Sequence, residues 1–508
     1  MVKKTNENAI VMENIQKYFN GLCVLKNFNV SIKKGSIHAL LGENGAGKTT
    51  LMNILYGLYK ADSGTIFING NKVNIKNSNT AIKLGIGMVH QHFMLVQPFT
   101  VLQNIILGKE PTNKFGILNF HKIRAEIQHL SQKYGLEVDL NEKVENISVG
   151  MQQRVEILKT LYRGAEILIL DEPTAVLATH EVEKLIDILH NLTEDGKTVI
   201  IITHKIKEIK KVAKYCTVIR KGQNVDTVNV DEVTENELAN MMVGRSVSLN
   251  VEKTVAQPKK EIFSIESLTV KDSKGLNKVD GLSLSVKQGE IMGIAGIDGN
   301  GQKELVDAIT NLARVESGKI KINGEEIQNT SIKNVINHKI STIPEDRHKM
   351  GLILDFTVAE NAVLTKYSKK PFHHNGVVNF NKVDEFADTV IKNFDVRPVD
   401  CKKFPVRSLS GGNQQKIIIG REISNKPDLL IAVQPTRGLD VGAIEYVHKS
   451  LINFRDSGRA VLLISLDLDE IMDVSDRIAV IYEGKIVDVI DAKDADENKI
   501  SLLMAGGK

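Results

Sequence analysis

Nine consecutive residues have the clearest potential for chemistry, because they fit G-x-x-x-x-G-K-[ST], the pattern of a loop that wraps nucleotide phosphates. They are Gly42, Glu43, Asn44, Gly45, Ala46, Gly47, Lys48, Thr49 and Thr50. Glycines let backbone N–H groups approach the phosphates, and Lys48 can reach the β- and γ-phosphates. The Thr49 hydroxyl can bind Mg²⁺. The run predicts a site for a nucleoside triphosphate with Mg²⁺.

The residues on either side of this loop are those that the pattern requires. Ile37–Leu41 is apolar, as a buried strand would be, and Leu51–Leu55 suits a helix. A strand, a phosphate loop and a helix in this order place the N–H groups of the helix start against the anion. We therefore expect the loop to join a buried strand to a helix.

An acidic pair, Asp171 and Glu172, follows a second apolar run, Ile167–Leu170. Carboxylates at the end of a buried strand can complete a nucleotide triphosphatase site. We expect Asp171 to hold Mg²⁺, mostly through water, and Glu172 to orient or deprotonate the attacking water. Alone, such a pair is also common in acidic turns, and the phosphate loop upstream favours the catalytic interpretation.

Three further side chains are candidates for the same site. His204 follows the strand-like run Val199–Ile202 and can hydrogen-bond a γ-phosphate while holding the catalytic glutamate and water in line. Gln91 has an amide that can sense the γ-phosphate or Mg²⁺. Phe19, or alternatively Tyr18, can stack on a base. Taken alone, Gln91 and the aromatic each fit a structural role better than a functional one.

Composition limits the class of protein. With 508 residues the chain is too long for one core, and 42% hydrophobic and 25% charged residues are typical of globular domains. The net charge of +4 gives no support to a nucleic-acid partner. The three cysteines are far apart and form no metal or disulfide pattern. No apolar run approaches a membrane span, so any role at a membrane requires a partner protein.

The chain contains a tandem repeat. Ser63–Gly70 has a near copy at Ser317–Gly324, and at the same spacing Gly42 corresponds to Gly296. Later landmarks, such as Ser148 and Ser410, are spaced further apart, so the second copy has extra residues in its middle. We expect two α/β domains, 1–249 and 261–508, joined by a linker over 250–260. Each would have a mostly parallel sheet and a helical subdomain, the first between Gln91 and Ser148.

A second motif carries a resemblance to a known family. Leu409 is followed by Ser410, Gly411, Gly412, Asn413 and Gln414. This motif and the phosphate loop resemble those of the ATP-binding subunits of ABC transporters, over nearly the whole chain and in both copies. The resemblance implies two P-loop domains that sandwich ATP between the phosphate loop of one and the signature motif of the other. It also implies that Asp440 contacts the opposite phosphate loop.

The two copies differ in a segregated way. In the second copy Gln302 and Lys303 replace Lys48 and Thr49, Val433 and Gln434 replace the acidic pair, Leu466 replaces His204, and Glu345 replaces Gln91. The first copy instead has a degraded signature, with Val149 and Met151, and has Ala178 where Asp440 stands in the second. All intact parts fall in one composite site. We expect one active site, formed within one chain or between two, and a second site without hydrolysis that can still bind nucleotide weakly.

Two halves on one chain resemble the importers of ribose, galactose, xylose and nucleosides. Met88–Val96, Ser148–Arg154 and Ile343–Lys349 favour the nucleoside branch over the sugar branch. The resemblance implies an ATPase on the cytoplasmic face of the cell membrane, with an integral membrane permease and a solute-binding lipoprotein. A twin-cassette ATPase acting on ribosomes or DNA fits less well, because the linker is short and zinc cysteines are absent. Glu172 and His204 argue against a purely regulatory nucleotide-binding protein.

Overall fold

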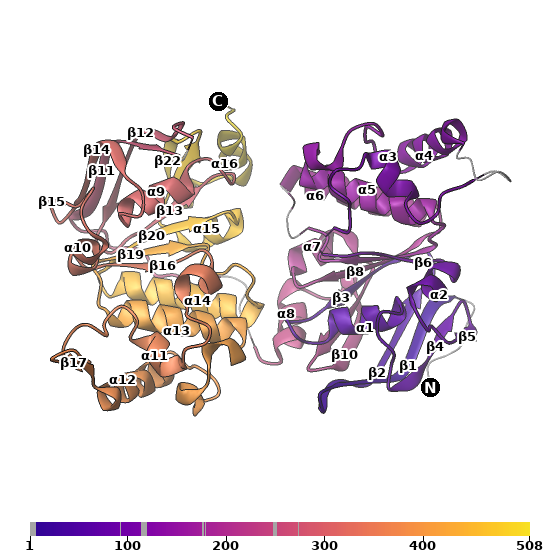
Figure 1. The fold of residues 1–508 in the computed structure, drawn as a ribbon, viewed down its shortest axis with the longest axis horizontal. Helices are drawn as coiled ribbons and strands as arrows, with labels where there is room; N and C mark the ends of the chain where they lie inside the picture. Colours follow the sequence, from indigo (N-terminus) through magenta and orange to yellow (C-terminus); the bar gives the residue numbers. More distant parts are fainter. Residues whose placement is uncertain are drawn as a thin grey trace. The chain divides into compact units, whose positions relative to one another are not determined.

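A computed structural model describes residues 7–91, 93–112, 119–174, 177, 179–246, 251–272 and 274–507. The chain divides into two compact units, residues 1–249 and 250–508. Among the described residues, both units contain the same order of strands and helices apart from a small additional hairpin in the second unit (Figure 1). The tandem α/β architecture predicted from the repeat is confirmed.

The first unit has two sheets. Antiparallel strands form the order β2-β1-β4-β5, and a mixed six-stranded sheet has the order β10-β9-β3-β8-β7-β6. Its strands are β1 Asn8–Phe19, β2 Leu22–Lys33, β3 Ile37–Leu41, β4 Ser63–Ile68, β5 Asn71–Val73, β6 Ile86–Val89, β7 Ile167–Asp171, β8 Thr198–Thr203, β9 Tyr215–Arg220 and β10 Gln223–Asn229. Its helices are α1 Lys48–Leu55, α2 Ser78–Lys83, α3 Val101–Ile106, α4 Phe120–Tyr134, α5 Val149–Tyr162, α6 Thr179–Glu194, α7 Ile206–Val212 and α8 Glu235–Val243.

The second unit repeats this plan, with sheet orders β12-β11-β14-β15 and β16-β19-β20-β13-β21-β22 and a small β17-β18 hairpin. Its strands are β11 Glu261–Lys271, β12 Asn277–Lys287, β13 Ile291–Ala295, β14 Val315–Ile322, β15 Glu325–Glu326, β16 Ile340–Ile343, β17 His373–His374, β18 Val377–Val378, β19 Leu429–Val433, β20 Ala460–Ser465, β21 Arg477–Tyr482 and β22 Lys485–Asp491. Its helices are α9 Gln302–Ile309, α10 Ile332–Asn337, α11 Val358–Ala362, α12 Phe380–Asn393, α13 Gly411–Ser424, α14 Val441–Asp456, α15 Leu468–Val474 and α16 Glu497–Met504.

The core of the first unit explains why its loops meet. One apolar cluster joins Ile10 of β1, Leu51 of α1, and Leu40 and Ile200 of the second sheet, so α1 packs between the two sheets. Strands β3, β6, β7 and β8 are parallel to one another and buried on both faces, as expected for continuous apolar runs. Parallel strands end at the same edge of the sheet, which places the segments that follow β3, β6, β7 and β8 together.

The expected linker is 250–260, and its residues 251–259 have no regular secondary structure and pack against the rest of the second unit. Lys253 Nζ donates to the Ser475 carbonyl at 2.5 Å, and Arg455 Nη2 donates to the Thr254 carbonyl at 3.0 Å. No helix among the described residues is long and apolar enough to cross a membrane.

Strand β3, which leads into the phosphate loop, carries a buried histidine with a testable consequence. His38 contacts the Thr217 hydroxyl at 2.8 Å, and burial lowers the pKa of His38 to about 4. In the unfolded chain a histidine takes a proton near pH 6.5. Between pH 6.5 and 4 the unfolded state therefore binds more protons than the folded state. As the pH is lowered through this range, His38 alone reduces the free energy of unfolding by about 1.4 kcal/mol per pH unit.

We expect His38→Leu to remove this contribution of His38, because leucine does not titrate. The Thr217 hydroxyl keeps its hydrogen bond to the Thr227 hydroxyl in this variant. Urea denaturation at pH 7.5 and pH 5.5 measures the free energy of unfolding, and hydrogen exchange of the β3 amides at the same pH values measures the stability of this strand. Replacement of the exposed His129 by alanine is the control, and its pH dependence should match the wild type. An unchanged pH dependence in His38→Leu would contradict the assignment.

Candidate nucleotide site

The phosphate loop of the first unit joins β3 to α1 as predicted. Lys48 is buried, and its Nζ donates to the carbonyls of Gly42 at 2.6 Å and Glu43 at 2.9 Å. Gly47 has φ 106°, and a Cβ there would lie 2.9 Å from Leu25 Cδ2. Only glycine suits this position. The loop thus holds its lysine in place through its own carbonyls.

The strand ends of the same unit bring three of the predicted catalytic residues into contact. Glu172, directly after β7, accepts a hydrogen bond from Gln91 Nε2 at 3.1 Å on one oxygen. Its other oxygen lies 3.0 Å from His204 Nδ1. Glu172 has a left-handed backbone, with φ 46°, and its N–H donates to the Ile202 carbonyl at 2.9 Å. Such a backbone is costly for a non-glycine residue and is typical of functional sites.

Burial and charge set the pKa values around this cluster. The hydrogen bond with His204 lowers the pKa of Glu172 and so favours the carboxylate form, although burial acts in the opposite direction. Burial raises the pKa of Asp171 to about 6, and the charge of Glu172 adds to the rise. Burial also lowers the pKa of Lys48, while Glu172 and Asp171 oppose that effect. The charges of Lys48, Asp171 and Glu172 therefore influence one another's pKa values.

Oxygen ligands for Mg²⁺ are present beside the loop. A hydrogen bond from the Thr49 hydroxyl lowers the pKa of Asp171, so a hydroxyl and a carboxylate oxygen meet at the start of α1. Mg²⁺ binds few protein oxygens and keeps several waters, and this donor set fits that preference. Among the described residues no cluster of three or more His, Cys, Asp or Glu side chains has the arrangement of a metal site.

The aromatic candidates lie at the end of β1. The Phe19 ring contacts Tyr59 edge-on, with centroids 5.3 Å apart, and Lys17 Nζ lies 5.2 Å from the Phe19 centroid. The Tyr18 N–H donates to Asp62 at 2.7 Å. Both rings remain partly exposed. Tyr59 was not recognised from the sequence, because nothing in its spacing connects it with Phe19.

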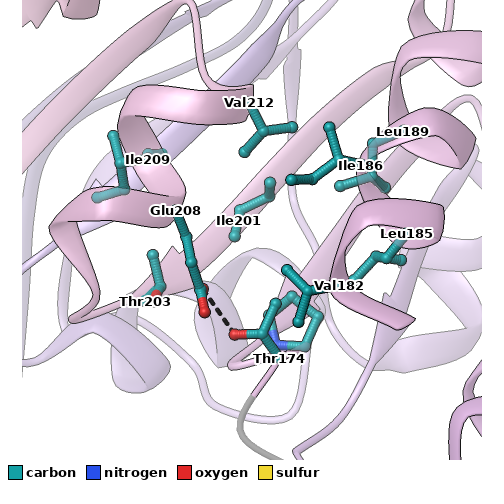
Figure 2. A pocket seen from close by; sticks show the side chains of 12 residues that line it. Thr174, Val182, Leu185, Ile186, Leu189, Ile201, Thr203, Glu208, Ile209 and Val212 are labelled. Atoms are coloured by element: carbon teal, nitrogen blue, oxygen red, sulfur yellow. Dashed lines mark hydrogen bonds between the residues drawn. The ribbon is translucent and has the colours of Figure 1, made fainter. Parts of the chain in front are cut away.

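A small apolar cavity lies behind the catalytic strand ends, between α6, α7 and β8 (Figure 2). At its edge the Thr174 hydroxyl donates to Glu208 at 2.6 Å. Thr174 follows Glu172 closely, and α7, which carries Glu208, begins just after His204. This hydrogen bond connects the segment after β7 with the segment after β8.

The second unit keeps the backbone of this site with different side chains. Gly301 precedes α9 with φ 102°, and Gln302 Nε2 donates to the Ile297 carbonyl at 3.0 Å, a neutral substitute for the lysine contact. Gln434 has φ 42° and its N–H donates to the Ile464 carbonyl at 2.7 Å. Its amide donates to Glu345 at 3.2 Å. The amide and the carboxylate have thus exchanged places relative to Gln91 and Glu172.

The signature motif forms the start of α13. Ser410 caps the helix by accepting from the Asn413 N–H at 3.5 Å, and Asn413 Nδ2 donates to the same hydroxyl at 2.9 Å. Asp440 caps α14 in the same way, accepting from the Ala443 N–H at 2.8 Å. A Cβ at Gly412 would lie 3.0 Å from Ala443, so the two helix starts lie side by side.

Gln414, in contrast, is buried inside the second unit. Its amide donates to the carbonyls of Val406 and Leu409, both at 3.2 Å, and its oxygen lies 2.8 Å from His348 Nε2. In this structure its side chain is engaged within the unit, whereas Ser410 is exposed and Asn413 is half-buried at the start of the helix.

The start of α5, the first unit's counterpart, differs in charge and shape. Ser148 caps the helix, accepting from the Met151 N–H at 3.3 Å. Val149 and Met151 are 42% and 44% exposed at this end. A Cβ at Gly150 would lie 2.1 Å from Glu181 Oε1, so a carboxylate sits against the helix start. A phosphate would meet negative charge there. Ala178, the residue opposite Asp440 in the repeat, lies outside the described residues.

The two units, each with a phosphate loop, paired strand ends and a capped signature helix, define a nucleotide-binding protein with two tandem cassettes. The ABC transporter family matches residues 25–175 and 279–437. The chain belongs to the ABC transporter family.

Curated relatives cover the chain almost completely. The guanosine import ATP-binding protein NupO of Bacillus subtilis is 55% identical over 98% of each chain. The nucleoside import ATP-binding protein NupA of Lactococcus lactis is 52% identical over 99% of each chain. A ribose import ATP-binding protein RbsA of Caldanaerobacter subterraneus is 38% identical over 99% of this chain and 100% of its own.

One solved structure also aligns with both units. The archaeal ribosome recycling factor aABCE1, in complex with the ribosomal stalk protein aP1, has a TM-score of 0.60. The alignment covers 96% of this chain and 91% of that one at 19% identity. At this identity the likeness supports the tandem fold alone.

Proposed function

We propose that this chain is the ATP-hydrolysing subunit of an ABC importer for nucleosides. The observation that carries the ATPase activity is the contact of Glu172 with both His204 and Gln91, beside a loop that retains its lysine. Nucleoside specificity rests on the relatives at 55% and 52% identity, both named for nucleoside or guanosine import. A sugar such as ribose or galactose is the alternative solute, supported by the ribose importer at 38% identity.

The residues of the site have distinct roles in this proposal. Lys48 and the backbone of residues 42–50 bind the phosphates of ATP, and Phe19 stacks on adenine. Thr49, Asp171 and Gln91 would hold Mg²⁺, which would supply positive charge against the phosphates. Glu172 orients the attacking water and accepts its proton, and His204 keeps Glu172 ionised and in line.

The second half of the site comes from the second unit, in the same chain or in another copy. Ser410, Gly411, Gly412, Asn413 and Asp440 face the γ-phosphate of ATP held by the first unit's loop. Helix N–H groups favour an anion at this end. The other combination would use a loop in which Gln302 replaces the lysine and a signature helix whose start carries the Glu181 carboxylate, so it is less suited to a phosphate. The functional domains have the limits 1–249 and 261–508, joined through 250–260.

A groove beside the Gln91 segment supports docking of an integral membrane permease. A cavity lies between the end of α1, β6 and α5, and its lining includes His90, Met94 and Glu156. Met94 is exposed, and its N–H donates to Glu156 at 2.9 Å while its carbonyl accepts from Lys159 Nζ at 3.1 Å. A permease element in this groove would move with the catalytic segment. The subunit would then act at the cytoplasmic face of the cell membrane, with solute delivered by a binding lipoprotein.

The test is solute-dependent ATP hydrolysis by the complete transporter, reconstituted in lipid vesicles with its permease and binding lipoprotein. We expect guanosine or other nucleosides to raise the rate, with ribose and galactose close to the rate without solute. Stimulation by ribose or galactose alone would replace the nucleoside assignment with the sugar alternative. Absence of ATP hydrolysis under all conditions would contradict the enzymatic assignment itself.

A further inference from the structure

One segment of the second unit has no counterpart of equal length in the first. Twelve positions separate Glu345 from Thr357, whereas nine separate Gln91 from Thr100. Both threonines cap a helix in the same way, so the additional residues lie between the loop and that helix. This longer segment contains a π-helical turn, Arg347–Gly351.

The first residue of this turn reaches the signature motif. Arg347 Nη1 donates to the Arg437 carbonyl at 2.8 Å. A Cβ at Gly411 would lie 3.0 Å from Arg347 Nη2, and one at Gly438 would lie 3.7 Å away. The guanidinium therefore lies between the start of α13 and the segment that leads to Asp440. Those are the two segments that the proposed site uses from the second unit.

Glu345 makes a second contact with the segment that leads to Asp440, this time through the side chain of Arg437. Glu345 accepts from the guanidinium of Arg437 and from Gln434 Nε2. Arg437 is thus held through its carbonyl by Arg347 and through its side chain by Glu345. Arg347 Nε is buried and has no hydrogen-bond partner among the described residues, and burial lowers the pKa of Arg347. Because the guanidinium is partly removed from water, its hydrogen bond to the Arg437 carbonyl contributes more to holding the side chain in place.

The first unit makes a different connection at the equivalent place. There Gln91 contacts Glu172, the proposed catalytic residue, directly. At the start of its signature helix, Gly150 faces the carboxylate of Glu181, whereas Gly411 faces the guanidinium of Arg347. Each loop thus contacts a different part of the machinery that the single active site requires.

We propose that Arg347 is a positioning residue for ATP hydrolysis: it holds Ser410–Gly411 and the segment before Asp440 in one arrangement. The Glu345 loop is thereby connected to the same ATP that the Gln91 loop contacts through Glu172. Both permease-facing loops then respond to one active site, although only one unit hydrolyses ATP. This inference rests on the proposed function, because it assumes that the second unit's signature serves the first unit's phosphate loop.

The experiment measures kcat and KM for ATP in the reconstituted transporter with Arg347→Ala and Arg347→Lys. We expect Arg347→Ala to lower kcat about 10- to 100-fold, since misplacement of positioned groups by about 1 Å has effects of this size. The KM for ATP should change much less, because Lys48 and its loop are untouched. Lysine keeps the charge but lacks the planar fork, so Arg347→Lys should recover part of kcat.

Arg407→Ala is the matched control. Arg407 is exposed, precedes Ser410 by a short turn, and pairs with Asp355. Its loss should leave kcat unchanged. Wild-type kcat in Arg347→Ala would overturn the inference. If Arg347→Ala does not fold, Arg347→Lys decides: a lowered kcat with an unchanged melting temperature supports the inference, and a wild-type kcat overturns it.

Ser410→Arg separates this inference from the proposed function. If Ser410→Arg abolishes hydrolysis while Arg347→Ala does not lower it, only the positioning role is wrong. If Ser410→Arg retains hydrolysis, the pairing of the second signature with the first loop is wrong.

Discussion

Glu172→Gln is expected to lower the ATP hydrolysis rate of the transporter by about 10²–10⁴-fold, the usual effect of losing a positioned general base. The glutamine keeps the size of the side chain and can still accept from Gln91 or His204, so the site should stay assembled. It cannot take a proton from water. Binding of ATP should persist, because Lys48 and its loop do not depend on the carboxylate for their hydrogen bonds. Single-turnover hydrolysis and equilibrium binding of labelled ATP measure the two effects separately.

Glu166→Gln is the matched control for this change. Glu166 stands at the opposite end of β7, is exposed, and pairs with Lys197 at 2.8 Å. The same chemical substitution beside the other end of this strand should leave the rate within about twofold, because ion pairs with an exposed partner contribute little. Steady hydrolysis by Glu172→Gln would assign the base to another residue. Loss of ATP binding in that variant would instead show that Glu172 organises the loop.

Much of the fold could be predicted from the sequence because its signals are local. Ile37–Leu41 is apolar apart from His38, and the positive φ of Gly47 is a requirement that the glycine spacing indicates directly. The repeat then extended one unit's architecture to the other. The contacts between Glu172 and His204 could also be predicted from the sequence, because parallel strands bring the residues after β7 and β8 to one edge of the sheet. Gln91, Glu172 and His204 were predicted from their positions after apolar runs, and the structure brings them together.

Contacts made by long side chains across segments could not be predicted in this way. Glu181 lies against Gly150 from the neighbouring helix, and no motif marks it. Arg347 falls within a segment, Ile343–Lys349, that was noted only as favouring one branch of the family. Arg347 contacts Gly411 because of the π-helical turn after Glu345, and the spacing of residues in the sequence does not predict the geometry of that turn. The sequence reveals which parts are intact or substituted, and the structure adds which charge each signature helix faces.

Ser410→Arg is expected to remove nearly all hydrolysis, with an effect as large as that of Lys48→Ala. Loss of one preorganised donor at a developing charge typically lowers kcat about 10²–10³-fold. The arginine would also fill the space at the start of α13 that the phosphate needs. Lys48→Ala removes the cation from the other half of the same site. Gln302→Ala, at the equivalent position of the second unit, is the control for Lys48→Ala and should keep most of the activity.

Ser148→Arg isolates the functional effect of Ser410→Arg from the loss of a helix cap. Ser148 and Ser410 each cap a signature helix through the N–H three residues on, at 3.3 and 3.5 Å. Removing either cap should destabilise its helix by about 1 kcal/mol. Only Ser410 belongs to the proposed active site, so Ser148→Arg should hydrolyse ATP at nearly the wild-type rate. Equal inactivation by both variants would mean that both signatures serve hydrolysis. A silent Ser410→Arg with an inactive Ser148→Arg would mean that the first unit's loop meets its own type of signature, in a pairing between equivalent units of two chains.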